Sequence, residues 1–241
     1  MALPKIEHPI NEVYLKSLDR KIRFRPFLVK EEKILMIAKE SEDNNDIKNA
    51  IIQVLQNCCL DDNVNVAELP LFDIEMFFIH LRIRSVGDSA KLTITCSNVP
   101  EGATEPCGHV TDFNMDLNKI EYEVPEDHTP YVSLTSDIGI KLKYPTVSII
   151  DNEVVDEYTA TIKVIADNID YIYDKDSVYK KETISKEELE NFIDDLTVDQ
   201  INAIRSFFAA TPKSVLNDTV TCKKCGFKHD IHLGDLNSFF S

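Results

Sequence analysis

Four cysteines, arranged as two pairs, are the residues of this sequence whose type and spacing could bind a metal ion. Cys222 and Cys225 are separated by two residues, Cys96 and Cys107 by ten, and a glycine follows the second cysteine of each pair. Each pair is expected between two strands, where a glycine with positive φ closes a tight knuckle. Zinc prefers four tetrahedral ligands, and four thiolates fill every position. The sequence therefore predicts one structural zinc ion held by Cys96, Cys107, Cys222 and Cys225.

Alternatives to this set of ligands stay open on the residues alone. The ten-residue spacing implies an enlarged first knuckle, so His109 or His229 could replace a cysteine, although both are expected on strands beside the site. The four cysteines could also be ordinary buried residues, which is the role expected for Cys58 and Cys59 on an apolar helix face. Residues 1–7 lack the apolar segment of a signal peptide, so we expect a reducing compartment in which disulfides are disfavoured.

The motifs of common enzyme sites are missing from the sequence. The chain has six glycines, and it contains no G-x-x-x-x-G-K phosphate loop, no G-x-S-x-G elbow and no H-E-x-x-H metal motif. The Cys222 pair is expected between two strands, whereas a thioredoxin-like redox pair lies between a strand and a helix. We therefore expect a non-enzymatic protein with neither catalytic residues nor an organic cofactor.

Charge excludes further classes of ligand. The formal net charge is −16, and residues 151–200 hold 15 acidic residues against 5 lysines. An acidic chain repels phosphate backbones, which argues against nucleic acid as the main ligand. The chain contains no run of about 18 apolar residues, so no membrane span is expected. Near the N-terminus, Lys21, Arg23 and Arg25 form a basic strand face, which either docks onto an acidic partner or is an ordinary solvated surface.

Hydrophobic spacing and cap residues predict the elements that position the cysteines. A β-hairpin is predicted from residues 13–16 and 21–25. Helices are predicted over 31–39, 46–59, 73–86 and 148–168, and two more open at the capping boxes of Ser185 and Thr197. Strands are predicted at 91–96, 110–117, within 122–144, before Cys222 and at 227–233. The fold class expected from this order is α+β.

The chain divides into four stretches that differ in composition and in predicted secondary structure. Residues 1–88 hold the hairpin and helices, 89–147 the strand-rich region with the first knuckle, 148–213 an acidic helical region, and 214–241 the second knuckle and an apolar tail. Because the four cysteines come from distant stretches, a shared ion would tie the middle of the chain to its end. We therefore expect one integrated body.

Several short segments occur in a fixed order along the chain. They are K-I-R-F-R-P-F-L-V-K-E-E-K at 21–33, L-P-L-F-D-I-E at 69–75, L-R at 81–82, S-V-G at 85–87, L-T at 196–197, F-F at 207–208, Pro212, C-x-x-C-G at 222–226 and L-N-S-F-F at 236–240. In this order they resemble one known family, the baseplate hub proteins of T-even-type contractile-tailed bacteriophages. The resemblance covers most of the chain, while the long loop between Cys96 and Cys107 departs from it. This family includes a hub subunit and a hub assembly catalyst, and it carries no catalytic residues over to this sequence.

The resemblance implies a structural or assembly protein of a phage tail baseplate that contacts other baseplate or tail proteins. The expected location is the host cytoplasm during assembly, with the virion tail baseplate as the final place. Two alternatives remain: a transient assembly chaperone absent from the mature virion, and a zinc-ribbon adaptor of transcription machinery. The tail residues Leu236, Phe239 and Phe240 have the spacing of one apolar helical face, which predicts either cover for the protein's own core or an anchor in a neighbouring protein.

Overall fold

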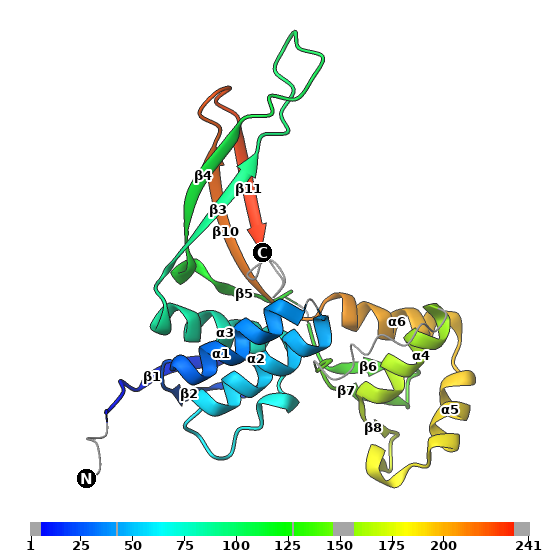
Figure 1. Cartoon of the computed structure of the whole chain (residues 1–241). Helices are drawn as coiled ribbons and strands as arrows, with labels where there is room; N and C mark the ends of the chain where they lie inside the picture. Colours follow the sequence, from blue (N-terminus) through cyan, green and yellow to red (C-terminus); the bar gives the residue numbers. More distant parts are fainter. Residues whose placement is uncertain (1–5, 42, 127, 147–156, 234–241) are drawn as a thin grey trace, which may run out of the picture. The chain divides into compact units, whose positions relative to one another are not determined.

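The computed structural model describes residues 6–41, 43–126, 128–146 and 157–233, and it confirms the α+β class (Figure 1). The chain forms two compact units. Unit 1 comprises Met1–Glu123 and Lys213–Ser241, and unit 2 comprises Val124–Pro212. The division into four stretches stays a prediction. Part of the predicted helix 148–168 and the predicted apolar tail (Leu236, Phe239, Phe240) lie outside the described residues.

Unit 1 begins with the predicted hairpin and three helices. Strands β1 (Asn11–Leu15) and β2 (Arg20–Phe24) pair antiparallel, and helices α1 (Val29–Ser41), α2 (Asn44–Cys58) and α3 (Leu71–Ser85) follow. Helix α3 contacts β1, α2 and strand β10 (Lys213–Thr221), and ten of its fifteen residues are buried. A helix buried over most of its surface belongs in a core, so α3 is the central element of this unit.

A buried carboxylate joins α3 to the hairpin. Asp73 is fully buried in the first turn of α3, and its oxygens accept the backbone N–H groups of Lys16 and Ser17, each at 2.9 Å. The Tyr122 hydroxyl also donates to Asp73 at 2.6 Å, and burial followed by this contact raises the pKa of Tyr122. The tight turn between β1 and β2 is therefore held by a residue 57 positions away in the chain.

Replacing Asp73 with alanine is expected to lower the free energy of unfolding by about 2–4 kcal/mol, because buried donors lose their shared acceptor. Tyr122→Phe removes one donor and keeps the carboxylate, so it should cost only about 1 kcal/mol. Urea denaturation of the two variants measures the difference. Equal costs would mean that the carboxylate does not organise the turn.

Two β-ribbons of unit 1 form an arm that leads away from the helices of that unit (Figure 1). In one ribbon, β3 (Ser89–Thr95) pairs antiparallel with β4 (Val110–Asp116). In the other, β10 pairs antiparallel with β11 (Lys228–Leu233) and, at its start, with β5 (Glu121–Glu123). A short 3-10 turn, Leu117–Lys119, connects β4 to β5, and another, Val66–Glu68, precedes α3.

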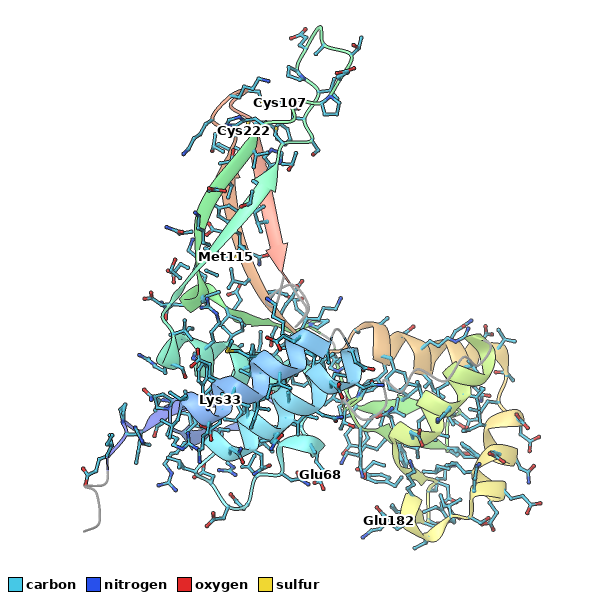
Figure 2. All side chains as sticks on the ribbon, in the orientation of Figure 1. Lys33, Glu68, Cys107, Met115, Glu182 and Cys222 are labelled. Carbon is cyan, nitrogen blue, oxygen red and sulfur yellow. The ribbon has the colours of Figure 1, made fainter. Side chains whose placement is uncertain are left out.

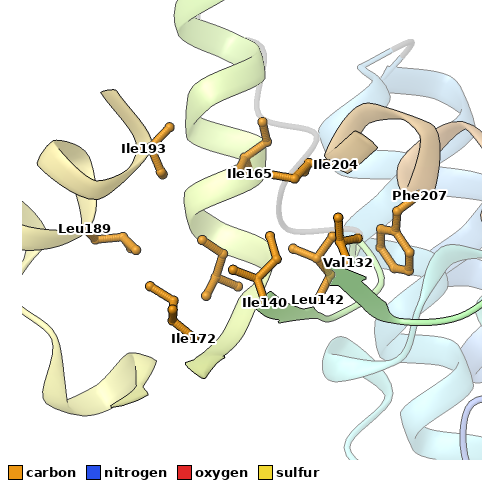
Figure 3. Close-up of a cluster of buried hydrophobic side chains, with 10 residues drawn as sticks. Val132, Ile140, Leu142, Ile165, Ile172, Leu189, Ile193, Ile204 and Phe207 are labelled. Carbon is orange, nitrogen blue, oxygen red and sulfur yellow. The ribbon is translucent and has the colours of Figure 1, made fainter. Parts of the chain in front are cut away.

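Unit 2 is inserted between β5 and β10, at the paired residues Glu123 and Lys213. Its sheet has the order β6 (Tyr131–Ser133), β7 (Gly139–Leu142), β8 (Ile169–Tyr173) and β9 (Val178–Lys180), and all neighbours are antiparallel. Helices α4 (Glu157–Asn168), α5 (Lys186–Asp194) and α6 (Val198–Ala209) supply the other side of its core (Figure 3). Both predicted capping boxes are present, at Ser185 and Thr197. Strands β8 and β9 were not predicted, since this acidic stretch was expected to be helical.

The cations of the hairpin are already paired within unit 1. Arg25 donates at 3.0 Å to Glu31, whose side chain is fully buried, and Arg23 contacts Asp61 at 2.9 Å through both Nε and Nη2. Lys21 lies 3.6 Å from Glu12 in an exposed pair. These internal ion pairs favour the interpretation of an ordinary surface for Arg23 and Arg25. Docking onto an acidic partner stays a prediction. Among the described residues, no helix is both long enough and apolar enough to cross a membrane.

Candidate metal centre

The second knuckle is closed by its backbone. Between β10 and β11, the Cys222 N–H donates to the carbonyl of Phe227 at 2.8 Å, and the Gly226 N–H donates to the carbonyl of Cys222 at 2.9 Å. Gly226 has a φ of 75°, a left-handed conformation that glycine adopts without a side-chain penalty. This turn places Cys222 and Cys225 on the same side of the chain reversal.

The first knuckle has the same hydrogen-bond pattern despite its longer loop. The Cys96 N–H donates to the carbonyl of His109 at 2.9 Å, and the Gly108 N–H, at a φ of 64°, donates to the carbonyl of Cys96 at 3.0 Å. The two ends of the inserted segment lie next to each other, because the Cys107 N–H donates to the carbonyl of Asn98 at 2.7 Å. The insertion therefore extends the loop without changing the knuckle.

The two knuckles bring the four predicted cysteines together at the end of the arm, where Figure 2 labels Cys107 and Cys222. The Sγ atoms of Cys96 and Cys225 are 3.6 Å apart, those of Cys107 and Cys222 are 3.9 Å apart, and all four lie within 4.8 Å of one another. The edge of a tetrahedron with metal–sulfur bonds of 2.3 Å is about 3.8 Å. A disulfide would need about 2.05 Å. The spacing fits four ligands of one ion.

The surroundings of the sulfurs stabilise thiolate unequally. The Phe227 N–H is the main cause that lowers the pKa of Cys225 to about 6, with smaller contributions from the neighbouring Cys96 and Asn98. Desolvation is the main cause that raises the pKa of Cys96 to about 12, and the neighbouring thiols raise it further. Four sulfurs at this spacing repel one another as thiolates, so a bound cation is what would allow all four to lose their protons.

Side chains around the cluster support the sulfurs. His229 is buried on β11, and its Nε2 lies 3.1 Å from the Cys96 Sγ, while Asn98 donates from Nδ2 to the Cys225 Sγ at 3.7 Å. Lys224 donates to the carbonyl of Cys107 at 3.2 Å. The role of Asn98 had no signal in the sequence, because it lies within the irregular ten-residue loop.

The cluster of mutually close ligand atoms consists of the four cysteines, and neither candidate histidine is a member. His109 contributes its backbone carbonyl to the first knuckle, and its side chain is half-buried just before β4. Cys58 is buried at the end of α2, where its Sγ lies 3.6 Å from Arg25 Nη1, and Cys59 is half-buried beside it. With four sulfur ligands, a bound ion has no open position for a substrate, so the arrangement suits a structural role.

Comparisons with known proteins bear on the family. Searches of curated proteins and of solved structures found no match. A family model described as "T4 bacteriophage base plate protein" matches residues 8–241, which include the helices of unit 1, all of unit 2 and both knuckles. On this match over nearly the full length, the chain belongs to the T4 bacteriophage base plate protein family.

Proposed function

We propose that this protein is a non-enzymatic component of the baseplate hub, and that its four cysteines bind one structural Zn²⁺ ion. The observation that carries the proposal is the cluster of four sulfurs, all within 4.8 Å of one another at the end of the arm, in a chain that belongs to a base plate family. The ion would join β3 and β4, from the middle of the chain, to β10 and β11 near its end.

Zinc fits this ligand set best among biological metals. Four thiolates form the closed tetrahedral shell of structural zinc sites, and zinc has no redox chemistry of its own to add. The arm also needs such a link, because a two-stranded ribbon is at best marginally stable in water. Residues on β3 alternate between exposed and half-buried, and only two residues of its partner β4 are fully buried, so the ribbon has a small apolar core.

The partners proposed for this component are other baseplate and tail proteins, with assembly in the host cytoplasm. A net charge of −16 makes nucleic acid an unfavourable ligand. The resemblance of the sequence to hub proteins supports the hub as the location within the baseplate.

Two measurements test the proposal together. Metal analysis of protein purified without chelators is expected to give one zinc per chain. Quantitative mass spectrometry of purified phage particles is expected to find the protein in the virion in fixed proportion to other baseplate proteins. A chain without zinc would refute the metal assignment. Absence from particles, combined with abundance in infected cells, would instead identify a transient assembly factor.

A further inference from the structure

The outer face of the sheet in unit 2 has a composition unlike the rest of that unit. Its four strands present two cross-strand rows, which are Tyr131–Lys141–Tyr171–Lys180 and Ser133–Gly139–Tyr173–Val178. The intervening row, which includes Val132, Ile140 and Ile172, points into the core toward the helices (Figure 3). We refer to Tyr131, Lys141, Tyr171, Tyr173 and Lys180 as the Tyr-Lys face.

The charge of the Tyr-Lys face is opposite to that of its unit. Residues 124–212 contain 18 acidic residues against 8 basic ones, yet neither cross-strand row contains an acidic residue. At the end of the sheet, Asp170 lies 3.0 Å from Lys141 and 3.1 Å from Lys143, so one carboxylate is shared by two cations. Lys180 is exposed on the edge strand β9 and adds a further positive charge. The face therefore carries net positive charge.

The aromatic rings of the Tyr-Lys face are held in place by one another. Tyr131 and Tyr171 each lie edge-on to Tyr173, with ring centroids 6.5 and 6.3 Å apart, and the Lys141 amine lies 5.3 Å from the centre of the Tyr171 ring. The Tyr173 ring covers Gly139, where a Cβ atom would overlap its hydroxyl and Cζ. Rings fixed before binding lose little conformational entropy when a partner covers them.

The face is open to solvent in the part of the chain that the structure describes. Tyr131 is 48% exposed and Val178 is 59% exposed, so apolar surface remains uncovered. Tyrosine is one of the residues that most often dominate the energy of protein interfaces, and lysines at the rim steer an oppositely charged partner.

We infer that the Tyr-Lys face is a docking surface for an acidic surface of another baseplate protein. This inference rests on the proposed function and specifies the part of the chain that makes the contact. Rings in the centre provide apolar contact area, and Lys180 faces a carboxylate of the partner. Lys141 and Lys143 share one carboxylate, Asp170, so together they contribute one further positive charge.

The test uses two matched double variants of the full-length protein. Tyr131→Ser with Lys180→Glu alters the Tyr-Lys face at exposed positions on the two edge strands. Val198→Ser with Lys186→Glu makes the same kinds of change on α6 and α5, where Val198 is 75% exposed and the Lys186 side chain is 89% exposed. Both variants should keep the wild-type melting temperature and the wild-type metal content.

Each variant is then added to baseplate intermediates purified from an infection by phage lacking this gene. The face variant is expected to bind at least about tenfold more weakly than wild type, and the control normally. Wild-type binding should also weaken as salt rises, because the lysines act at the rim. Equal binding by wild type and the face variant would overturn the inference. It would leave the zinc and hub proposals intact, since those depend on the cysteines and on the presence of the protein in particles.

A photo-crosslinking residue at position 131, introduced as Tyr131→p-benzoylphenylalanine, identifies the occupant. The expected product is a crosslink to an acidic segment of a different baseplate protein. Crosslinks only to a second copy of this chain, only to nucleic acid, or to no other molecule would each overturn the inference.

Discussion

Replacing Cys222 with serine is expected to abolish binding of the proposed metal ion and to unfold the arm of unit 1. The hydroxyl of serine is a poor ligand for a site built from soft thiolates. Without the bound cation, the three remaining thiolates would repel one another at the spacing of the cluster. Apparent binding free energies of structural zinc are on the order of 10–16 kcal/mol near pH 7. The β3–β4 ribbon depends most on such a link, because β3 has no fully buried side chain and β4 has two.

Limited proteolysis and metal analysis measure this outcome. New cleavage sites are expected in β3, β4, β10 and β11, together with loss of the metal, and chelation of the wild-type protein should produce the same pattern. Cys59→Ser is the matched control, because Cys59 is half-buried outside the cluster. Cys222→Ser protein that kept its metal and resisted protease like the wild type would contradict a structural role for the ion.

Arg25→Ala is expected to lower the free energy of unfolding by about 3–5 kcal/mol, because it leaves a buried carboxylate without its main partner. Glu31 is fully buried at the start of α1, where it also accepts the Leu28 N–H at 2.9 Å. Arg25 further donates to the carbonyls of Pro26 and Asn57, so its loss removes those two hydrogen bonds as well.

The neighbouring arginine is the control for this prediction. Arg23 pairs with Asp61, but 57% of its side chain is exposed, so Arg23→Ala should cost no more than about 1 kcal/mol. The double variant Arg25→Met with Glu31→Gln removes both charges and should be more stable than Arg25→Ala. Urea denaturation ranks the three variants. Similar stability of Arg25→Ala and Arg23→Ala would show that the Arg25 pair is no stronger than a surface pair.

The same pair contributes to acid sensitivity. Burial alone would raise the pKa of Glu31, but the Arg25 and Leu28 hydrogen bonds outweigh it and lower the pKa. A carboxyl whose pKa is lower in the folded state stabilises the fold above its unfolded value, about 4.3. This stability is lost as the pH falls through the folded pKa. Urea denaturation at pH values from about 5 to about 3 covers this transition. Over that range, the double variant should lose less stability than the wild type.

The local features of the fold could be predicted from the sequence alone. The hairpin, the helix caps at Ser185 and Thr197, and the two knuckle turns depend on residues a few positions apart, so their patterns are visible in the chain. Cysteine type and spacing also identified all four members of the cluster. Strands β8 and β9 escaped detection because an acidic stretch between helices resembles a helical surface more than a sheet.

Tertiary structure alone decided which distant groups meet. Cys96 lies beside Cys225 across 129 positions, and Asp73 holds a turn 57 positions away. Glu31 pairs with Arg25, which the sequence pattern placed on an open strand face. The insertion of unit 2 between β5 and β10 appears only when Glu123 is seen to pair with Lys213. Such contacts depend on how whole elements pack around a core, and spacing in the sequence contains little information about that packing.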